Sequence, residues 1–166
     1  MAGSSKKVIM VGLDDSTESL HSLEWTLDHV VTPVTVGYFR IVLLHVKVPA
    51  LYVLRFTSSG MAAGDIITKV ESDLNRSAAA VSKAATEACE KRSFKDFEIE
   101  MVNGDPREEL CEAVIRHKAE ILVVGSHGYG TFKRVVLGSV SDYCAHHAAC
   151  SVLIVKKEKS RHQHGD

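Results

Sequence analysis

The chain has 166 residues, of which 45% are hydrophobic and 25% are charged, and this length and composition are typical of one globular domain. Twenty lysine and arginine residues nearly balance 21 aspartate and glutamate residues, for a net charge of -1, which removes the usual electrostatic argument for a nucleic-acid partner. The longest apolar neighbourhood is broken by charged residues and proline, so the sequence predicts no membrane span.

Two further features bear on where the protein works. The apolar run at residues 8–13 is short and strand-like, too short for the core of a signal peptide. The four cysteines lack CxxC spacing and are most simply read as reduced thiols, although a redox role stays open. They are Cys89, Cys111, Cys144 and Cys150. The sequence therefore predicts a cytoplasmic protein.

Five short apolar runs predict β-strands. They cover residues 7–13, 39–48, 96–102, 120–125 and 151–156. The first, second and fourth are almost continuous in Val, Ile and Leu, which is typical of strands covered on both faces of a parallel sheet. The third alternates apolar and acidic residues, which favours a place at the edge of the sheet.

Helical patterns separate these strands. They cover residues 16–31, about 65–91, 106–118 and about 135–148. Asp15 and Glu18 are expected to form a capping box on the first helix. Asp105 is expected to cap the third, with Pro106 at its first position. Strands and helices alternate along the whole chain, which predicts an open, mostly parallel α/β sheet with right-handed crossovers.

One domain is expected over residues 7–157, between a disordered N-terminus at 1–6 and a polar tail at 158–166. The least regular stretch, residues 49–64, is interpreted as a flap. Its apolar residues have three open interpretations: they pack on the core, line a ligand pocket or face a partner.

The stretch from residue 125 to 144, "GSHGYGTFKRVVLGSVSDYC", follows the fourth strand and is rich in glycine. Gly125 and Gly128 would allow positive φ and a close ligand approach. Gly138 and Ser139 would open the last helix, whose free N–H groups form an anion site. Neither P-loop nor GxGxxG spacing is present. The residues alone leave two interpretations of this stretch, a tight connection between strand and helix or a cradle for phosphate. The basic pair "KR" at 133–134 also has two interpretations, since it would either shield phosphate charge or form a solvated turn.

The spacing G-x2-G-x9-G-S, with "LDDS" after strand one, "LLHV" on strand two, "GDPREEL" before helix three and a final "SVLIVK", resembles the universal stress protein family. The resemblance runs from about residue 7 to 157 and is greatest to plant single-domain members. It implies a Rossmann-like, adenine nucleotide alpha hydrolase-like α/β fold, an open five-stranded sheet of order 3-2-1-4-5 with helices on both faces. It also implies ATP or AMP as ligand, with Mg²⁺ as an optional companion.

The family pattern implies a role for each matching position. Gly12 and Leu13 would line the base and sugar, Asp14 would hold the ribose hydroxyls, and the backbone of Val46 would meet adenine. The remaining implied positions, most of them around the phosphates, are Val124, Gly125, His127, Gly128, Gly138, Ser139, Val140 and Ser141. Residues 129–136 would form a movable bridge over the phosphates.

Three competing interpretations are weighed against this site. Asp14 would be a helix cap, but Asp15 suits that role better and would leave Asp14 to the ligand. No catalytic residue is predicted, because no paired carboxylate or nucleophile accompanies His127. No metal site is predicted either, because the side chains of "CAHHAAC" at 144–150 scatter around one helix.

The last strand, Ser151 to Lys156, would be an exposed apolar edge in a monomer. The resemblance implies antiparallel pairing of this strand in a homodimer. The favoured function is a nucleotide-dependent sensor or switch in the cellular stress response, with at most slow ATP hydrolysis and with unknown signalling or client proteins. The alternative is a stress-linked chaperone or redox-responsive oligomer in which nucleotide is incidental; a weaker one is an adenylyl-group transferase.

Overall fold

The computed structural model describes residues 5–54, 63–126 and 137–157, and the structural statements that follow refer to these residues. They form one sheet of five parallel strands in the order β3-β2-β1-β4-β5. The strands are β1 (Lys7–Leu13), β2 (Phe39–Lys47), β3 (Phe97–Asn103), β4 (Ala119–Gly125) and β5 (Ser151–Val155). The predicted fold class and strand order are therefore confirmed.

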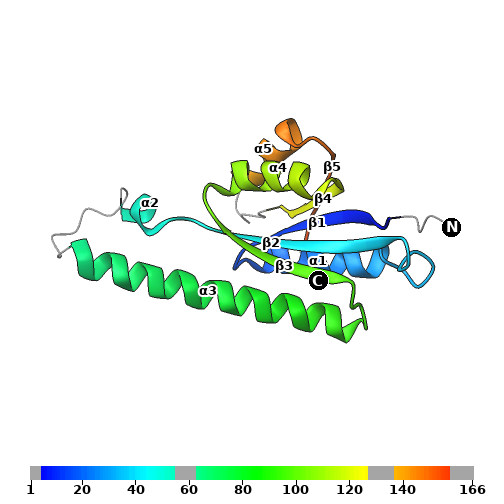
Figure 1. The fold of residues 1–166 in the computed structure, drawn as a ribbon, viewed down its shortest axis with the longest axis horizontal. Coiled ribbons are helices and arrows are strands. Elements are labelled where there is room, and N and C mark those ends of the chain that lie inside the picture. The colour runs from blue at the N-terminus through cyan, green and yellow to red at the C-terminus, as the bar shows by residue number, and fades with distance from the viewer. Residues whose placement is uncertain (1–4, 55–62, 127–136, 158–166) are drawn as a thin grey trace, which may run out of the picture.

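The helices cover both faces of this sheet (Figure 1). They are α1 (Thr17–His29), α2 (Ala50–Leu54), α3 (Ala63–Lys91), α4 (Pro106–His117) and α5 (Ser139–His147). Residues of α1 and α3 pack with alternate strand residues in one apolar cluster, and residues of α4 and α5 pack with the others in a second. Burial on both faces explains why β1, β2 and β4 read as continuous apolar runs.

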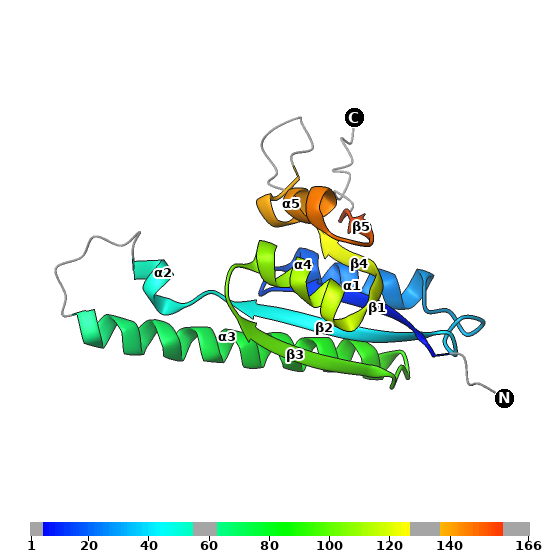
Figure 2. The same cartoon turned by 45° about the horizontal axis from the view of Figure 1, so that its top comes forward.

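The end of the molecule that carries α2 differs from the sequence prediction. Residues 50–54 form the short helix α2, and its Leu51 and Tyr52 are exposed rather than packed on the core. Figure 2 shows α2 and the first turns of α3 extending beyond the sheet. At a rise of about 1.5 Å per residue the 29 residues of α3 span about 43 Å, well beyond the length of any strand in the sheet. The rest of the predicted flap, 55–62, lies outside the described residues.

The helix caps agree with the sequence prediction in α4 and differ in α1. The Asp105 side chain accepts a hydrogen bond from the backbone N–H of Arg107 at 2.9 Å, with Pro106 in the first turn. The predicted Asp15–Glu18 capping box is wrong, because α1 begins at Thr17 and its N-cap is Ser16. The Ser16 backbone is extended and its hydroxyl accepts from the N–H of Ser19 at 3.2 Å.

The last helix is shorter than expected within the described residues. It begins at Ser139, and Gly138 is its N-cap in an extended conformation. No helix in the described ranges is long and apolar enough to cross a membrane.

Candidate nucleotide-binding site

A cleft opens at the carboxyl ends of β1 and β4. The chain leaves β1 for α1 on one face of the sheet and leaves β4 for α5 on the other. Strand order reverses between these two strands, and such switch points are where open α/β sheets bind ligands. The cleft holds about 680 Å³, counted with its open mouth.

The residues that were predicted to bind the nucleotide lie together in this cleft. Twelve were predicted, and every one that lies within the described residues lines it. These are Gly12, Leu13, Asp14, Val46, Val124, Gly125, Gly138, Ser139, Val140 and Ser141. His127 and Gly128 lie outside the described residues, as does the predicted bridge at 129–136 with its basic pair.

Five further residues that line the cleft were not predicted. They are Ser16, Ser19, Leu44, Pro106 and Leu110. Ser16 and Ser19 lie at the start of α1, where the sequence analysis chose Asp15 as the cap. Assigning the cap to Ser16 would have indicated both serines as cleft residues. Leu44 and Val46 alternate on β2 and share a face, a period-two signal that could have been read from the sequence. Pro106 and Leu110 come into the cleft only through the packing of α4.

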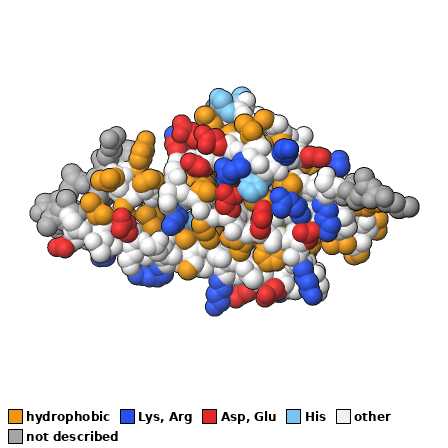
Figure 3. Space-filling view, in the orientation of Figure 1, with side chains coloured by type: hydrophobic (Ala, Val, Ile, Leu, Met, Phe, Trp, Pro, Cys, Tyr) orange, Lys and Arg blue, Asp and Glu red, His pale blue; other side chains and the backbone are white. Residues whose placement is uncertain are grey.

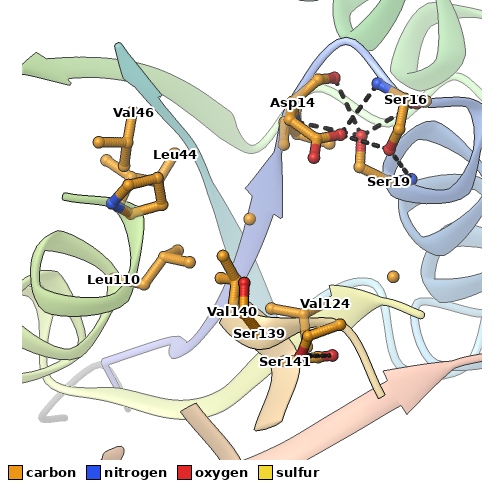
Figure 4. A pocket seen from close by; sticks show the side chains of 15 residues that line it. Asp14, Ser16, Ser19, Leu44, Val46, Leu110, Val124, Ser139, Val140 and Ser141 are labelled. Atoms are coloured by element: carbon orange, nitrogen blue, oxygen red, sulfur yellow. Dashed lines mark hydrogen bonds between the residues drawn. The ribbon is translucent and has the colours of Figure 1, made fainter. Parts of the chain in front are cut away.

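Asp14 is held at one end of the cleft by the first turn of α1 (Figure 4). Its Oδ1 accepts hydrogen bonds from the backbone N–H of Ser16, at 2.9 Å, and from the Ser16 hydroxyl. The Ser19 hydroxyl accepts from the Asp14 N–H at 3.1 Å and lies 3.0 Å from the Asp14 carbonyl, to which it can donate. Asp14 is therefore not the N-cap of α1, which is Ser16. Its carboxylate is fixed by the residues of that cap.

The N-terminus of α5 forms a second wall. Gly138 caps this helix without a side-chain hydrogen bond, and the first intrahelical bond runs from the N–H of Asp142 to the Gly138 carbonyl at 2.9 Å. The N–H groups of the preceding three residues have no intrahelical acceptor. A serine or aspartate cap would occupy one of them, whereas glycine leaves them to a ligand. The Ser141 hydroxyl donates to the Gly138 carbonyl at 3.0 Å.

The opposite end of the cleft is apolar. Figure 4 shows Leu44, Val46 and Leu110 together, away from Asp14 and its serines. A Cβ added at Gly12 would lie 3.0 Å from Cδ2 of Leu110, so the glycine leaves room for this side chain on the cleft floor. The cleft thus combines an apolar end, a carboxylate and a row of backbone N–H groups.

Gly125 lines the cleft, but it does not have the positive φ that was predicted for it. Among the described glycines, Gly104 alone has positive φ, so Gly125 does not make a left-handed turn. A Cβ added there would lie only 2.7 Å from the carbonyl oxygen of Glu18 and 3.0 Å from the backbone nitrogen of Ser19. The glycine therefore lets the first turn of α1 pack directly on the end of β4.

The electrostatics of the cleft suit a ligand with both hydroxyl and anionic groups. Asp14 is the one charged side chain among the described lining residues, and a fixed carboxylate accepts hydrogen bonds from hydroxyls. The positive end of the α5 dipole favours an anion. Within the described residues, no group of three or more His, Cys, Asp or Glu side chains has the arrangement of a metal site.

Comparison with known sequences relates the chain to one family. The model of the universal stress protein family matches residues 6–156. A universal stress protein A-like protein of Arabidopsis thaliana is 29% identical over 164 residues, which cover 93% of each protein. The universal stress protein PHOS32 of the same plant is 29% identical over 96% of this chain and 68% of its own length.

Solved structures of universal stress proteins also resemble this chain. A universal stress protein family protein of Arabidopsis thaliana, crystallised with AMP bound, has 26% identity and a TM-score of 0.67 over 92% of each chain. A universal stress protein crystallised in complex with cAMP has 25% identity and a TM-score of 0.64, over 92% of this chain and 98% of its own.

Proposed function

The chain belongs to the universal stress protein family, and we propose that it binds an adenine nucleotide, ATP or AMP, in the cleft between β1 and β4. We further propose that it acts as a nucleotide-dependent sensor or switch in the stress response of the cytoplasm. The observation that carries the proposal is the convergence of the described predicted positions on one cleft at the switch point of the sheet. Two structural relatives hold adenine nucleotides.

The three parts of the cleft suit the three parts of a nucleotide. The base lies between Leu44, Val46 and Leu110, where its faces are removed from water. The ribose hydroxyls donate to Asp14, because its carboxylate is fixed at that end of the cleft and a carboxylate accepts hydrogen bonds from hydroxyls. The phosphates lie against the N–H groups at the start of α5.

The backbone of β2 favours adenine over guanine. The Lys47 carbonyl accepts from the N–H of Gly104, on the β3 side of the strand, at 3.0 Å. Backbone groups of successive strand residues face opposite neighbours, so the Val46 carbonyl faces the β1 side. There β1 has ended, because its last residue, Leu13, is paired with His45. The Val46 carbonyl can accept from the amino group of adenine, whereas guanine presents an oxygen at that position.

Magnesium enters this proposal only as a companion of ATP. Mg²⁺ is commonly held by one or two protein oxygens together with phosphates of the ligand. Serine and aspartate oxygens of the cleft are donors of that kind. The bound ion would neutralise phosphate charge.

Calorimetric titration of ATP, AMP and GMP into the purified protein tests the proposal, together with an assay of the nucleotide that copurifies. Asp14→Asn is expected to weaken AMP binding by about tenfold or more, since hydrogen bonds to a charged group are among the strongest. Asp15→Asn is the matched control, because Asp15 does not line this cleft. Gly138→Val keeps an allowed backbone conformation and crowds the phosphates.

Each result has a separate meaning. Failure of the wild type to bind any adenine nucleotide would reject the proposal. Equal binding by Gly138→Val would place the phosphates elsewhere, and equal affinity for AMP and GMP would remove the role of the Val46 carbonyl.

A further inference from the structure

The peptide that joins Leu13 to Asp14 is held by two buried side chains. The pairing of β1 with β2 ends at Leu13 and His45, so this peptide lies where the strand gives way to the loop. The Nδ1 of His45 lies 2.9 Å from the Leu13 carbonyl oxygen, and the Ser19 hydroxyl accepts from the Asp14 N–H at 3.1 Å. The two side chains come from β2 and α1, and only 7% of His45 and 5% of Ser19 is exposed.

His45 stands behind the cleft rather than in it. Side chains alternate between the two faces along a strand, and the neighbours of His45 on β2, Leu44 and Val46, are the ones that line the cleft. His45 therefore points to the opposite face of the sheet, where Leu43 of the same strand packs with α1 and α3. Its influence on a ligand in the cleft would pass through the backbone that it holds.

We propose that His45 is a positioning residue for nucleotide binding. By fixing the Leu13–Asp14 peptide it aims the Asp14 carboxylate at the ribose hydroxyls, and it thereby sets the preference of the cleft for nucleotides that carry both of these hydroxyls. This inference rests on the proposed function, whereas the hydrogen bond from His45 is present without any ligand.

The bonds of His45 and Ser19 set the direction of the Asp14 side chain. A peptide group is planar, so these two bonds fix the whole unit that precedes the Asp14 Cα. The Ser19 hydroxyl also lies 3.0 Å from the Asp14 carbonyl oxygen, which belongs to the unit that follows it. With both units held, the backbone dihedrals of Asp14 are set, and with them its Cα–Cβ direction. A carboxylate that is aimed before the ligand arrives loses less conformational entropy on binding.

The bond defines which nitrogen of His45 carries a proton. A carbonyl oxygen only accepts, so Nδ1 donates. Asparagine at this position would keep an N–H donor close to the place of Nδ1, whereas leucine would keep the branched shape of asparagine without the donor. His45→Leu and His45→Asn therefore separate the hydrogen bond from the bulk of the side chain.

Heteronuclear NMR of the histidine ring nitrogens tests the bond in the wild type without ligand. The spectrum is recorded at a pH of about 8.5, where an ordinary imidazole is neutral and only one of its nitrogens holds a proton. We expect this proton on Nδ1 of His45, whose signals are identified by their loss in His45→Asn. A His45 ring that is protonated on the other nitrogen alone would overturn the proposal.

Titration of AMP and of its dideoxy analogue, which lacks both ribose hydroxyls, tests the positioning role. The wild type is expected to prefer AMP. His45→Leu should bind AMP about three- to tenfold more weakly, the loss typical of one hydrogen bond, and should bind the analogue within about twofold of the wild type. His45→Asn should keep the preference for AMP. The matched control is His29→Leu, because His29 Nδ1 lies 2.9 Å from the Trp25 carbonyl oxygen at the far end of α1.

Ser19→Ala gives a second test, which stands even where His45→Leu does not fold by circular dichroism. It removes the hydroxyl that holds the same peptide from the side of α1, so it should also reduce the preference for AMP over the analogue.

The outcomes separate this inference from the proposed function. Equal losses for both ligands in His45→Leu would show that the histidine supports only the fold of the cleft, and an unchanged preference would show that Asp14 is held without it. Either result overturns the positioning role. A wild type that binds AMP and the analogue equally would overturn the contact of Asp14 with ribose together with the role of His45. A wild type that binds neither would reject the proposed function, while NMR still decides the hydrogen bond.

Discussion

Gly125 shows at the scale of one residue how closely α1 approaches the sheet. The backbone of Glu18 and Ser19 occupies the space that a Cβ would need. This turn also carries the residues that hold Asp14, so the glycine fixes the distance between the carboxylate and the end of β4.

We predict that Gly125→Ala lowers the free energy of unfolding by about 1–3 kcal/mol, because overpacking against backbone cannot be relieved by a rotamer change. Urea denaturation followed by circular dichroism measures the effect. Gly37→Ala is the matched control, since a Cβ there meets nothing within 4 Å. Its expected effect is neutral or slightly stabilising. Equal stabilities of the two variants would show that α1 can move away from β4 at little cost.

The residues of the β1–α1 connection also show where sequence reasoning succeeded and failed. The family pattern placed Asp14 in the cleft, which the structure supports. The choice of helix cap among "DDS" was wrong, because three consecutive residues can each cap a helix and the winner depends on where the first turn meets β4. Because the cap was assigned to Asp15, Ser16 and Ser19 were not predicted to line the cleft.

At the scale of elements, periodicity was sufficient for most of the fold. Strands buried on both faces and capped helices carry strong local signals, and their bounds differ from the predicted ones by only a few residues. α2 carries no such signal, because it is only five residues long and its Leu51 and Tyr52 are exposed. Pro106 and Leu110 could not be assigned to the cleft from sequence, because their position depends on how α4 packs across the sheet.

The edge strand β3 is joined to α4 by a cluster of charges. Figure 3 shows acidic, basic and histidine side chains gathered over the middle of the molecule, where Figure 1 places α4 and β3. The Glu100 carboxylate accepts from Arg116 and from His117, each at 2.5 Å. Burial opposes ionisation of Glu100, but these two hydrogen bonds prevail and hold its pKa below the ordinary value of 4.5.

We predict that this cluster makes the free energy of unfolding depend on pH in the acidic range. A lowered pKa in the folded state means that Glu100 stabilises the fold at pH values above 4.5, and that the contribution is lost as the pH falls through the lowered pKa. Glu100→Gln should therefore be less stable than the wild type at pH 7, and the difference should shrink on acidification. Urea denaturation at a series of pH values measures it. A difference that is constant with pH would show that the charge of Glu100 contributes nothing.

At the scale of the whole molecule, β5 leaves one edge of the sheet unpaired within the described chain. Its central residues, 152–154, are apolar and only partly buried, and such an edge readily pairs with another strand. The Val155 carbonyl accepts from the N–H of Ser126 on the β4 side at 3.0 Å. Because backbone groups alternate along a strand, the N–H of Ile154 faces outward.

We predict that the protein is a homodimer in which β5 pairs with its twin, and that Ile154→Pro makes it a monomer by removing an outward N–H from the shared ladder. Light scattering after size exclusion should give twice the 18.1 kDa chain mass for the wild type and one chain mass for the variant, at micromolar concentration. Leu153→Pro is the contrasting variant. It removes an N–H that faces β4 and should lower thermal stability rather than act on assembly alone. A monomeric wild type, or a dimer that survives Ile154→Pro, would contradict pairing through this strand.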